Sequence, residues 1–304
     1  MTQPDKRPSK LLALACDIKL SHSVFALPFA ILAAYLAAAS QGKLLHHDGV
    51  SLLLILVCMF LARTLAMTIN RLADHKIDQH KPRTKGRAIP SGRLSFTYVL
   101  TVTIVCAVAF IASTSGFYFF RDNYWPLLLS PLVLILLSAY SFMKRFTALC
   151  HIFLGSALAI SPLAAGIAIA PEYLNQPDLW YLAGMVLFWV AGFDVIYALQ
   201  DEEPDAEHGI HSIPSTVGTQ KALWISRILH LLCVTCLYLF WQSSSHLNMI
   251  FSIGVAIVIL LLVIEHMLVR DPDTGKINMA FFTLNGIISI LLGTLGIIDI
   301  VRSV

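Results

Sequence analysis

Long apolar stretches recur along most of the chain and alternate with short polar segments. A helix that crosses the hydrocarbon core of a bilayer needs about 20 mostly apolar residues. We therefore predict an all-α, polytopic membrane protein with about nine transmembrane helices, at about 22–39, 51–70, 96–113, 124–143, 148–170, 178–200, 221–240, 247–268 and 278–301. Because no spacer between them is long enough for a soluble domain, we expect residues 1–304 to form a single transmembrane domain.

Composition supports a location in lipid. The 304 residues are 57% hydrophobic and 13% charged, whereas a soluble domain carries about 25% charged residues. The mean hydropathy of +0.76 indicates the same. We expect the lipid bilayer, and no nucleic acid, as the macromolecular surroundings of this chain.

The distribution of basic residues predicts the orientation in the membrane. Lysine and arginine collect in cytoplasmic loops. With the N-terminus inside, all but four of the 21 basic residues fall on the cytoplasmic side, the four being Lys43, Arg63, Arg121 and Arg302. We expect a cytoplasmic N-terminus and a C-terminus on the opposite side.

Two groups of aspartates lie where predicted helices emerge on the cytoplasmic side. The first contains Asn70, Asp74 and Asp78, four residues apart. Each four-residue step turns an α-helix by only about 40° beyond a full turn, so these side chains form one stripe about 12 Å long. A lone stripe of this kind would also be typical of a solvated helix end.

The second group contains Asp194, Asp201 and Asp205. Steps of seven and eleven residues return to within about 20° of the starting direction on an ideal helix. Pro204 disfavours helical geometry at Glu203, so we expect Asp205 just past the helix end. Carboxylates in a membrane span are costly unless they face a cavity or a partner. Two groups at the same depth therefore favour a functional site over two solvated helix ends.

These aspartates have the chemistry of a magnesium–diphosphate site. Mg²⁺ usually binds through one or two carboxylates together with substrate phosphates. We therefore predict that both groups hold Mg²⁺ ions that bridge a diphosphate, through Asp74, Asp78, Asp201 and Asp205. Arginine and lysine grip phosphate oxygens, and the sequence places nearby Arg83, Lys85, Arg87, Lys144 and Arg145. The orientation rule alone explains their side of the membrane, but not their concentration beside the aspartates.

Two segments resemble the Asp-rich motifs of the UbiA superfamily of intramembrane prenyltransferases. NRLADHKIDQHKPRTKGRAIPSG follows that family's N-x3-D-x3-D pattern, and DVIYALQDEEPDAEHGIHSIP follows its D-x2-Y-A-x2-D-x3-D pattern. The resemblance extends to YSFMKRFTALCH and SHSVFALPFA, with RAIPSG in place of the commoner RPLPSG. KRFT-x-LCH, HGIHSIP and EHMLVRDPDTGKINMAFFTLN are most similar to the 4-hydroxybenzoate polyprenyltransferase branch.

The resemblance implies a helical bundle around a central cavity, with the aspartates at its cytoplasmic mouth, in a bacterial inner membrane. It implies Mg²⁺-dependent transfer of a polyprenyl group from an allylic polyprenyl diphosphate to an aromatic acid, 4-hydroxybenzoate, ortho to its hydroxyl, in quinone biosynthesis. Dihydroxynaphthoate, haem or a lipid ether are alternative acceptors within the family. A secondary transporter is a rival from another class, but transporter sites lie near the midplane of the membrane.

Several residues have both a functional and a structural interpretation. We expect Asp194 to orient or deprotonate the acceptor, with Tyr197 beside it, although Tyr197 is equally typical of an interfacial packing residue. Asn70 and Lys19 are candidate diphosphate contacts. For Lys19 the alternative is a side chain that reaches the membrane interface as an anchor.

Overall fold

The computed structural model describes residues 9–19 and 25–304, and its described part contains helices and turns but no β-strand. The α-helices are α1 (Lys10–Asp17), α2 (Leu27–Ala39), α3 (Gly49–Asp78), α4 (Phe96–Arg121), α5 (Trp125–Met143), α6 (Cys150–Ile169), α7 (Pro177–Ala198), α8 (Glu202–Glu207), α9 (Ile213–Val217), α10 (Thr219–Ser243), α11 (Met249–Leu268), α12 (Thr274–Asn278) and α13 (Asn285–Ser303). A π-helical turn, Met279–Leu284, joins α12 to α13. Three 3₁₀ turns lie at Leu45–His47, Pro171–Asn175 and Leu199–Asp201. The predicted all-α polytopic class is confirmed.

Eight helical segments in the described residues are long and apolar enough to cross a membrane. They contain α3, α4, α5, α6, α7 with α8, α10, α11, and α12 with α13. The ninth predicted span corresponds to α2, a shorter apolar helix of 13 residues, and its predicted first residues, 22–24, lie outside the described part of the chain. The predicted helices are therefore present, with α2 as the short one.

Helix α3 is longer than the apolar pattern predicts. Asp48 caps its start by accepting a hydrogen bond from the Ser51 N–H (3.0 Å), and the helix continues through the polar segment to Asp78. Three charged residues of its last turns, Arg71, Asp74 and Asp78, are buried. Hydropathy ends the predicted helix at residue 70 because it cannot distinguish a buried polar turn from an exposed one.

Helix α1 was not predicted, and it packs on the segment that follows α3. Ala13 and Leu14 form a small buried cluster with Ala88, Leu94 and Val99. The first turn of α1 is capped by the Ser9 hydroxyl, which accepts from the Leu12 N–H. This contact fixes the N-terminal segment beside the loop that carries many of the basic residues.

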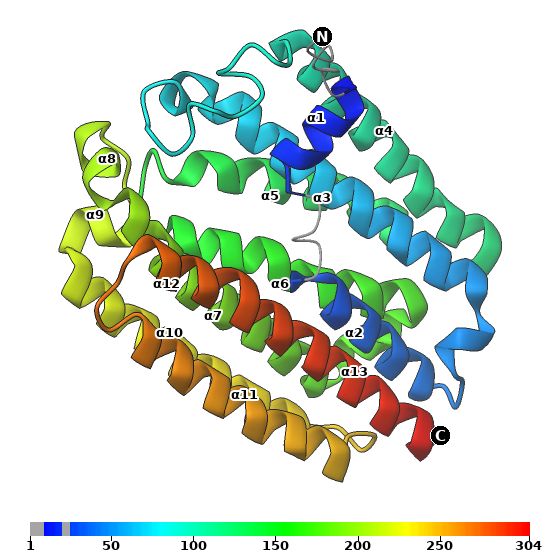
Figure 1. Ribbon diagram of the computed structural model, residues 1–304. Helices are drawn as coiled ribbons and strands as arrows, with labels where there is room; N and C mark the ends of the chain where they lie inside the picture. The colour runs from blue at the N-terminus through cyan, green and yellow to red at the C-terminus, as the bar shows by residue number, and fades with distance from the viewer. Residues whose placement is uncertain (1–8, 20–24) are drawn as a thin grey trace, which may run out of the picture.

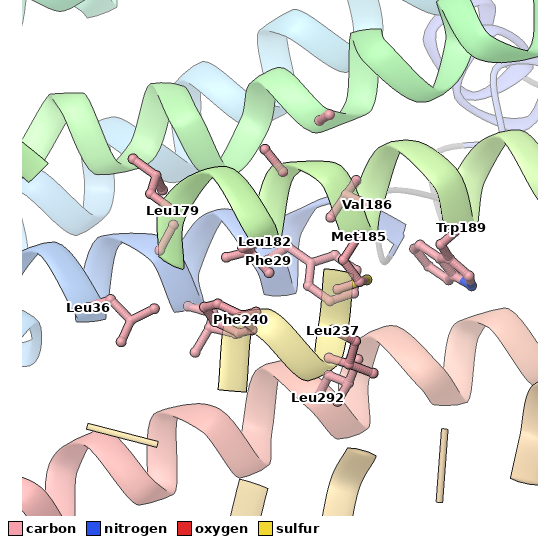
Figure 2. Close-up of a cluster of buried hydrophobic side chains, with 14 of the residues drawn as sticks. Phe29, Leu36, Leu179, Leu182, Met185, Val186, Trp189, Leu237, Phe240 and Leu292 are labelled. Atoms are coloured by element: carbon pink, nitrogen blue, oxygen red, sulfur yellow. The ribbon is translucent and has the colours of Figure 1, made fainter. Parts of the chain in front are cut away.

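The core lies around α7, which packs between α6 and α10. Figure 2 shows Leu182, Met185 and Trp189 of α7 meeting Phe29 of α2 and Leu237 of α10. Trp189 is fully buried. In contrast, α4 and α5 expose many large apolar side chains, as expected for helices that face lipid.

Small residues allow α6 and α7 to approach closely. A Cβ atom on Gly155 would lie 2.3 Å from the Leu187 carbonyl oxygen, so only glycine fits that contact. On the other face of α7, a Cβ atom on Gly192 would lie 2.3 Å from the His230 ring. Small residues at helix contacts are typical of membrane proteins, because they let the backbones approach closely.

The loop 79–95 and the segment α8–α9 lie at the same end of the bundle, at the left in Figure 1, and the C-terminus lies at the opposite end. We call this end the motif end, because both Asp-rich motifs reach it. Which side of the membrane it faces is still a prediction from the positive residues.

That orientation can be tested by labelling single cysteines in sealed vesicles. Thr84 is buried, so the suitable reporter in this loop is the exposed Lys85. In a background without the six native cysteines, we expect a membrane-impermeant maleimide to label Lys85→Cys only from the cytoplasmic face and Val304→Cys only from the other. Labelling of Lys85→Cys from the outer face alone would contradict the prediction.

Candidate active site

The first Asp motif forms a buried polar stripe on α3. Asp74 and Asp78 have only 1% and 3% of their surface exposed. The Asn70 amide donates a hydrogen bond to Asp74 Oδ2 (3.2 Å). Asn70 and Asp74 therefore share a face, as their spacing predicts.

Asp74 is held by the connection between α5 and α6. The Lys144 ammonium forms an ion pair with Asp74 Oδ2, and the Arg145 guanidinium lies 3.7 Å from Oδ1. Arg145 also donates to the carbonyl of Ala73. Asp74 Oδ1 is buried but accepts no hydrogen bond within the described part of the chain. One oxygen of this carboxylate thus still has capacity for a ligand.

An arginine of the loop after α3 forms an ion pair with the same motif. Arg87 pairs with Asp78, with an Nη1–Oδ2 distance of 2.7 Å. Thr84 donates to the Asp78 carbonyl at 3.3 Å. Both contacts fold the loop back over the end of α3.

The same loop reaches across to the second Asp motif. Arg83 donates to Asp201 through Nε (3.0 Å) and also through Nη2. Its Nη1 donates to the Tyr197 hydroxyl (3.1 Å). Lys81, six residues before Arg87, forms a buried ion pair with Asp205. Two basic residues of one loop therefore join the two motifs, which are more than 100 residues apart in sequence.

The charge on Arg83 is strongly stabilised. Burial disfavours the guanidinium charge, but its hydrogen bonds and attraction to Asp201 outweigh burial and raise the pKa of Arg83 above its ordinary value. The pair is partly exposed, so solvent screens it. Arg83 is therefore a permanent cation at the point where the two motifs meet.

The second motif is not one continuous helix. α7 ends at Ala198, a 3₁₀ turn covers Leu199–Asp201, and α8 begins at Glu202. Asp205 lies past the end of α7, as expected, but within the separate short helix α8. Pro204 falls in the first turn of α8, where proline removes no required N–H donor, so the break comes earlier, at 199–201.

Asp194 lies apart from these ion pairs. Its Oδ2 is 2.6 Å from His151 Nδ1, and the Nε2 of that ring accepts from the Ile213 N–H at 3.2 Å. The described residues show no contact between Asp194 and a lysine or arginine. Asp194 in α7 and Asp201 in the 3₁₀ turn after α7 therefore have different electrostatic surroundings.

Lys19, just after the end of α1, lies near arginines of α3 and of the loop that follows α3. Its Nζ lies 4.8 Å from the centre of the Phe282 ring. Desolvation, and then the positive charges of Arg83, Arg71 and Arg87, lower the pKa of Lys19. A positive field strong enough to disfavour another cation is well suited to bind an anion.

Sequence reasoning missed several residues of this region, and one of the residues that it named lies apart from the ion pairs. Lys81 and Arg71 were counted only as orientation signals, yet Arg71 forms a buried pair with Asp17 (3.1 Å). Lys85 is exposed, and among the described residues its ammonium forms no hydrogen bond or ion pair with either motif. The sequence also contained no indication of a role for His151, which pairs with Asp194.

The oxygen and nitrogen donors of this region suit a magnesium ion together with its diphosphate. Within the described residues no three His, Cys, Asp or Glu side chains converge as a metal cage. Mg²⁺ does not require one, because it keeps several waters and binds through one or two carboxylates plus substrate phosphates. Asp74 Oδ1 supplies an oxygen without a hydrogen bond, and the ammonium and guanidinium groups on the aspartates can transfer to phosphate. The residues fit a magnesium–diphosphate pair.

Comparison with known proteins gave concordant matches. The model of the UbiA prenyltransferase family matches residues 26–287. A 4-hydroxybenzoate octaprenyltransferase of Francisella tularensis subsp. novicida is 30% identical over 268 residues, which cover 87% of this chain and 88% of that protein. One from Hahella chejuensis is 30% identical over 226 residues, 73% of this chain and 71% of that protein.

Solved structures share the fold. An apo UbiA homologue from Aeropyrum pernix K1 superposes with a TM-score of 0.79 at 27% identity, over 92% of this chain and 98% of that one. A UbiA homologue from Archaeoglobus fulgidus, bound to GPP and Mg²⁺, superposes with a TM-score of 0.70 at 20% identity, over 96% of this chain and 100% of that one.

Proposed function

Because this chain belongs to the UbiA prenyltransferase family, we propose that it transfers a polyprenyl group from an allylic polyprenyl diphosphate to 4-hydroxybenzoate, with Mg²⁺ as cofactor. The chain is an integral membrane prenyltransferase, and the acceptor, the metal and the residue roles are the proposal. Relatives named 4-hydroxybenzoate octaprenyltransferase support the acceptor. We further propose that residues 1–304 work as one domain in a bacterial inner membrane, with the motif end in the cytoplasm.

One observation carries the proposal: the loop 79–95 joins the two Asp motifs through cation–carboxylate pairs. Lys81 binds Asp205, and Arg83 binds Asp201. An incoming diphosphate brings negative charge to the cations, and its metal brings positive charge to the carboxylates. The ion pairs seen here can therefore exchange partners without leaving a charge unpaired in the membrane, which would be costly.

The proposed roles follow from this exchange. Asp74, Asp78, Asp201 and Asp205 would hold Mg²⁺, with Asn70 orienting Asp74. Phosphate oxygens would be bound by Lys19, Lys81, Arg83, Arg87, Lys144 and Arg145. When bound, Mg²⁺ neutralises charge that develops on the leaving diphosphate. Lys85 is exposed and forms no ion pair with either motif among the described residues, so its predicted diphosphate contact would need the loop to rearrange.

Besides binding the diphosphate, the site must assist removal of a proton from the aromatic acceptor. The allylic C–O bond breaks, and diphosphate leaves with the electron pair. A ring carbon ortho to the phenol then forms the new C–C bond, and the ring loses one proton to regain aromaticity. Asp194, away from the cations, would accept the phenol hydrogen bond and assist proton removal. Tyr197 would stack on the acceptor or hydrogen-bond to it, beside Asp194.

The reaction can be tested with membranes that contain the protein, radiolabelled allylic diphosphates and a panel of aromatic acceptors. We expect label to enter 4-hydroxybenzoate at a ring carbon, to fall to background with a chelator, and to return when Mg²⁺ is added. Membranes without the protein are the control. Transfer only to dihydroxynaphthoate or another acceptor would contradict the proposed substrate, and transfer that survives chelation would contradict the cofactor.

A further inference from the structure

His151 and Asp194 form a short, directed contact between α6 and α7. The distance from His151 Nδ1 to Asp194 Oδ2 is 2.6 Å. The imidazole is buried, with 3% of its side chain exposed, whereas the Asp194 side chain is 22% exposed. The carboxylate is therefore the accessible member of the pair, and the imidazole stands behind it.

The hydrogen bonds define the protonation of the imidazole. Ile213 donates its backbone N–H to His151 Nε2 at 3.2 Å. A nitrogen that accepts an N–H must present its lone pair. The ring proton of a neutral imidazole then lies on Nδ1 and is donated to Asp194. An imidazolium would direct an N–H on Nε2 against the Ile213 N–H.

The Ile213 donor is itself held in place. Ser212 and Ser215 form a reciprocal capping box at the start of α9. Two residues before Ile213, the His211 N–H donates to the Lys144 carbonyl at 2.7 Å. The backbone around the Ile213 N–H is thus held by the start of α9 and by the α5–α6 connection. The position of this donor relative to the imidazole is therefore fixed.

We propose that His151 is a positioning residue for prenyl transfer: locked as the neutral Nδ1–H tautomer by Ile213, it fixes the Asp194 carboxylate with Oδ1 left for the phenolic acceptor. This rests on the proposed role of Asp194. In the described part of the chain, Oδ1 accepts no protein hydrogen bond. His151 holds one oxygen of the carboxylate and leaves the other for substrate, but it neither takes up nor releases a proton during the reaction.

A purely structural pair explains these contacts less well. Replacing both partners of a buried hydrogen bond with apolar side chains of the same shape can be nearly neutral or stabilising. Packing between α6 and α7 alone is already achieved by glycine, as at Gly155. A carboxylate with one restrained and one accessible oxygen is, in contrast, what orientation of a phenol requires.

Two substitutions at position 151 separate positioning from other roles. In His151→Gln the amide can donate to Asp194 and accept from Ile213, as the neutral imidazole does, whereas His151→Leu can do neither. We expect His151→Leu to lower kcat by about 10- to 100-fold, the effect of one hydrogen bond to a charged group. His151→Gln should restore kcat to within about threefold of the wild type. KM for the allylic diphosphate should change little in both.

His47→Leu is the matched control, because His47 is exposed in a 3₁₀ turn far from the motif end, and it should leave kcat unchanged. A wild-type kcat in His151→Leu would overturn the proposal. Equal loss in folded His151→Gln and His151→Leu would do so as well, since it would mean that the imidazole carries a proton that an amide cannot.

The tautomer can also be measured in the wild-type protein, independently of whether His151→Leu folds. With ¹⁵N-labelled histidine, and His151→Gln to assign the signal, we expect a protonated Nδ1 and an unprotonated Nε2. An imidazolium, or a proton on Nε2, would overturn the inference. Failure of the proposed function is recognised separately, because it appears as absence of phenol prenylation by the wild-type protein itself.

Discussion

Replacing Asp74 with asparagine is expected to lower kcat/KM for prenyl transfer by about 100- to 1,000-fold, the loss typical of removing a group that stabilises developing charge. Asp74 is 1% exposed, pairs with Lys144, and keeps one oxygen without a hydrogen bond. Asparagine has nearly the same shape but removes the negative charge that would hold Mg²⁺, and it leaves the Lys144 ammonium unneutralised.

The measurement is initial transfer rate over a range of Mg²⁺ concentrations in purified protein, with thermal unfolding recorded in parallel. Asp48→Asn is the matched control: Asp48 also pairs with an arginine, Arg121, but it lies at the start of α3, away from the motif end. We expect the control to transfer at the wild-type rate. A folded Asp74→Asn enzyme with near-normal activity at limiting Mg²⁺ would show that this carboxylate is not a metal ligand.

Asp194→Asn is expected to abolish most transfer while leaving diphosphate binding intact. The loss of a group that assists proton removal lowers rates by about 100- to 10,000-fold. Asp194 pairs with His151 rather than with the cations of the motifs, and seven residues separate it from Asp201, about 10 Å along a helix. The affinity for Mg²⁺ with a non-reactive diphosphate analogue should therefore stay close to that of the wild type.

Asp201→Asn supplies the comparison. Asp201 is bound by Arg83 through two nitrogens, so its loss should weaken both analogue binding and transfer. Calorimetry in detergent gives the binding affinity, and the transfer assay gives the rate. If Asp194→Asn loses analogue affinity as severely as Asp201→Asn, Asp194 belongs to the metal site and the division of roles is wrong.

Much of the fold was predictable because its determinants are local in sequence. Apolar length identified the membrane spans, and the four-residue spacing placed Asn70 and Asp74 on one face of α3, where they contact each other. The extension of α3 to Asp78, the short helix α1 and the 3₁₀ break at Leu199–Asp201 were not predicted. Each of these depends on burial of polar groups by other segments, which a hydropathy pattern does not record.

The partners of the aspartates were decided by the tertiary structure. Lys81, Arg83 and Lys85 alternate along one loop and carry the same charge, yet Lys81 is buried on Asp205, Arg83 binds Asp201, and Lys85 faces solvent. The sequence does not indicate which of the three binds an aspartate, because this depends on the path of the loop across the bundle.

The sequence by itself determined the class of protein, the helices and the two Asp motifs, since helical periodicity and transfer into lipid act through neighbours along the chain. Only the tertiary structure brought the motifs together through the loop 79–95 and placed His151 behind Asp194. Hydrogen bonds and ion pairs between distant segments are short-ranged and directional. They therefore depend on how helices cross and loops return, which spacing along a single chain does not encode.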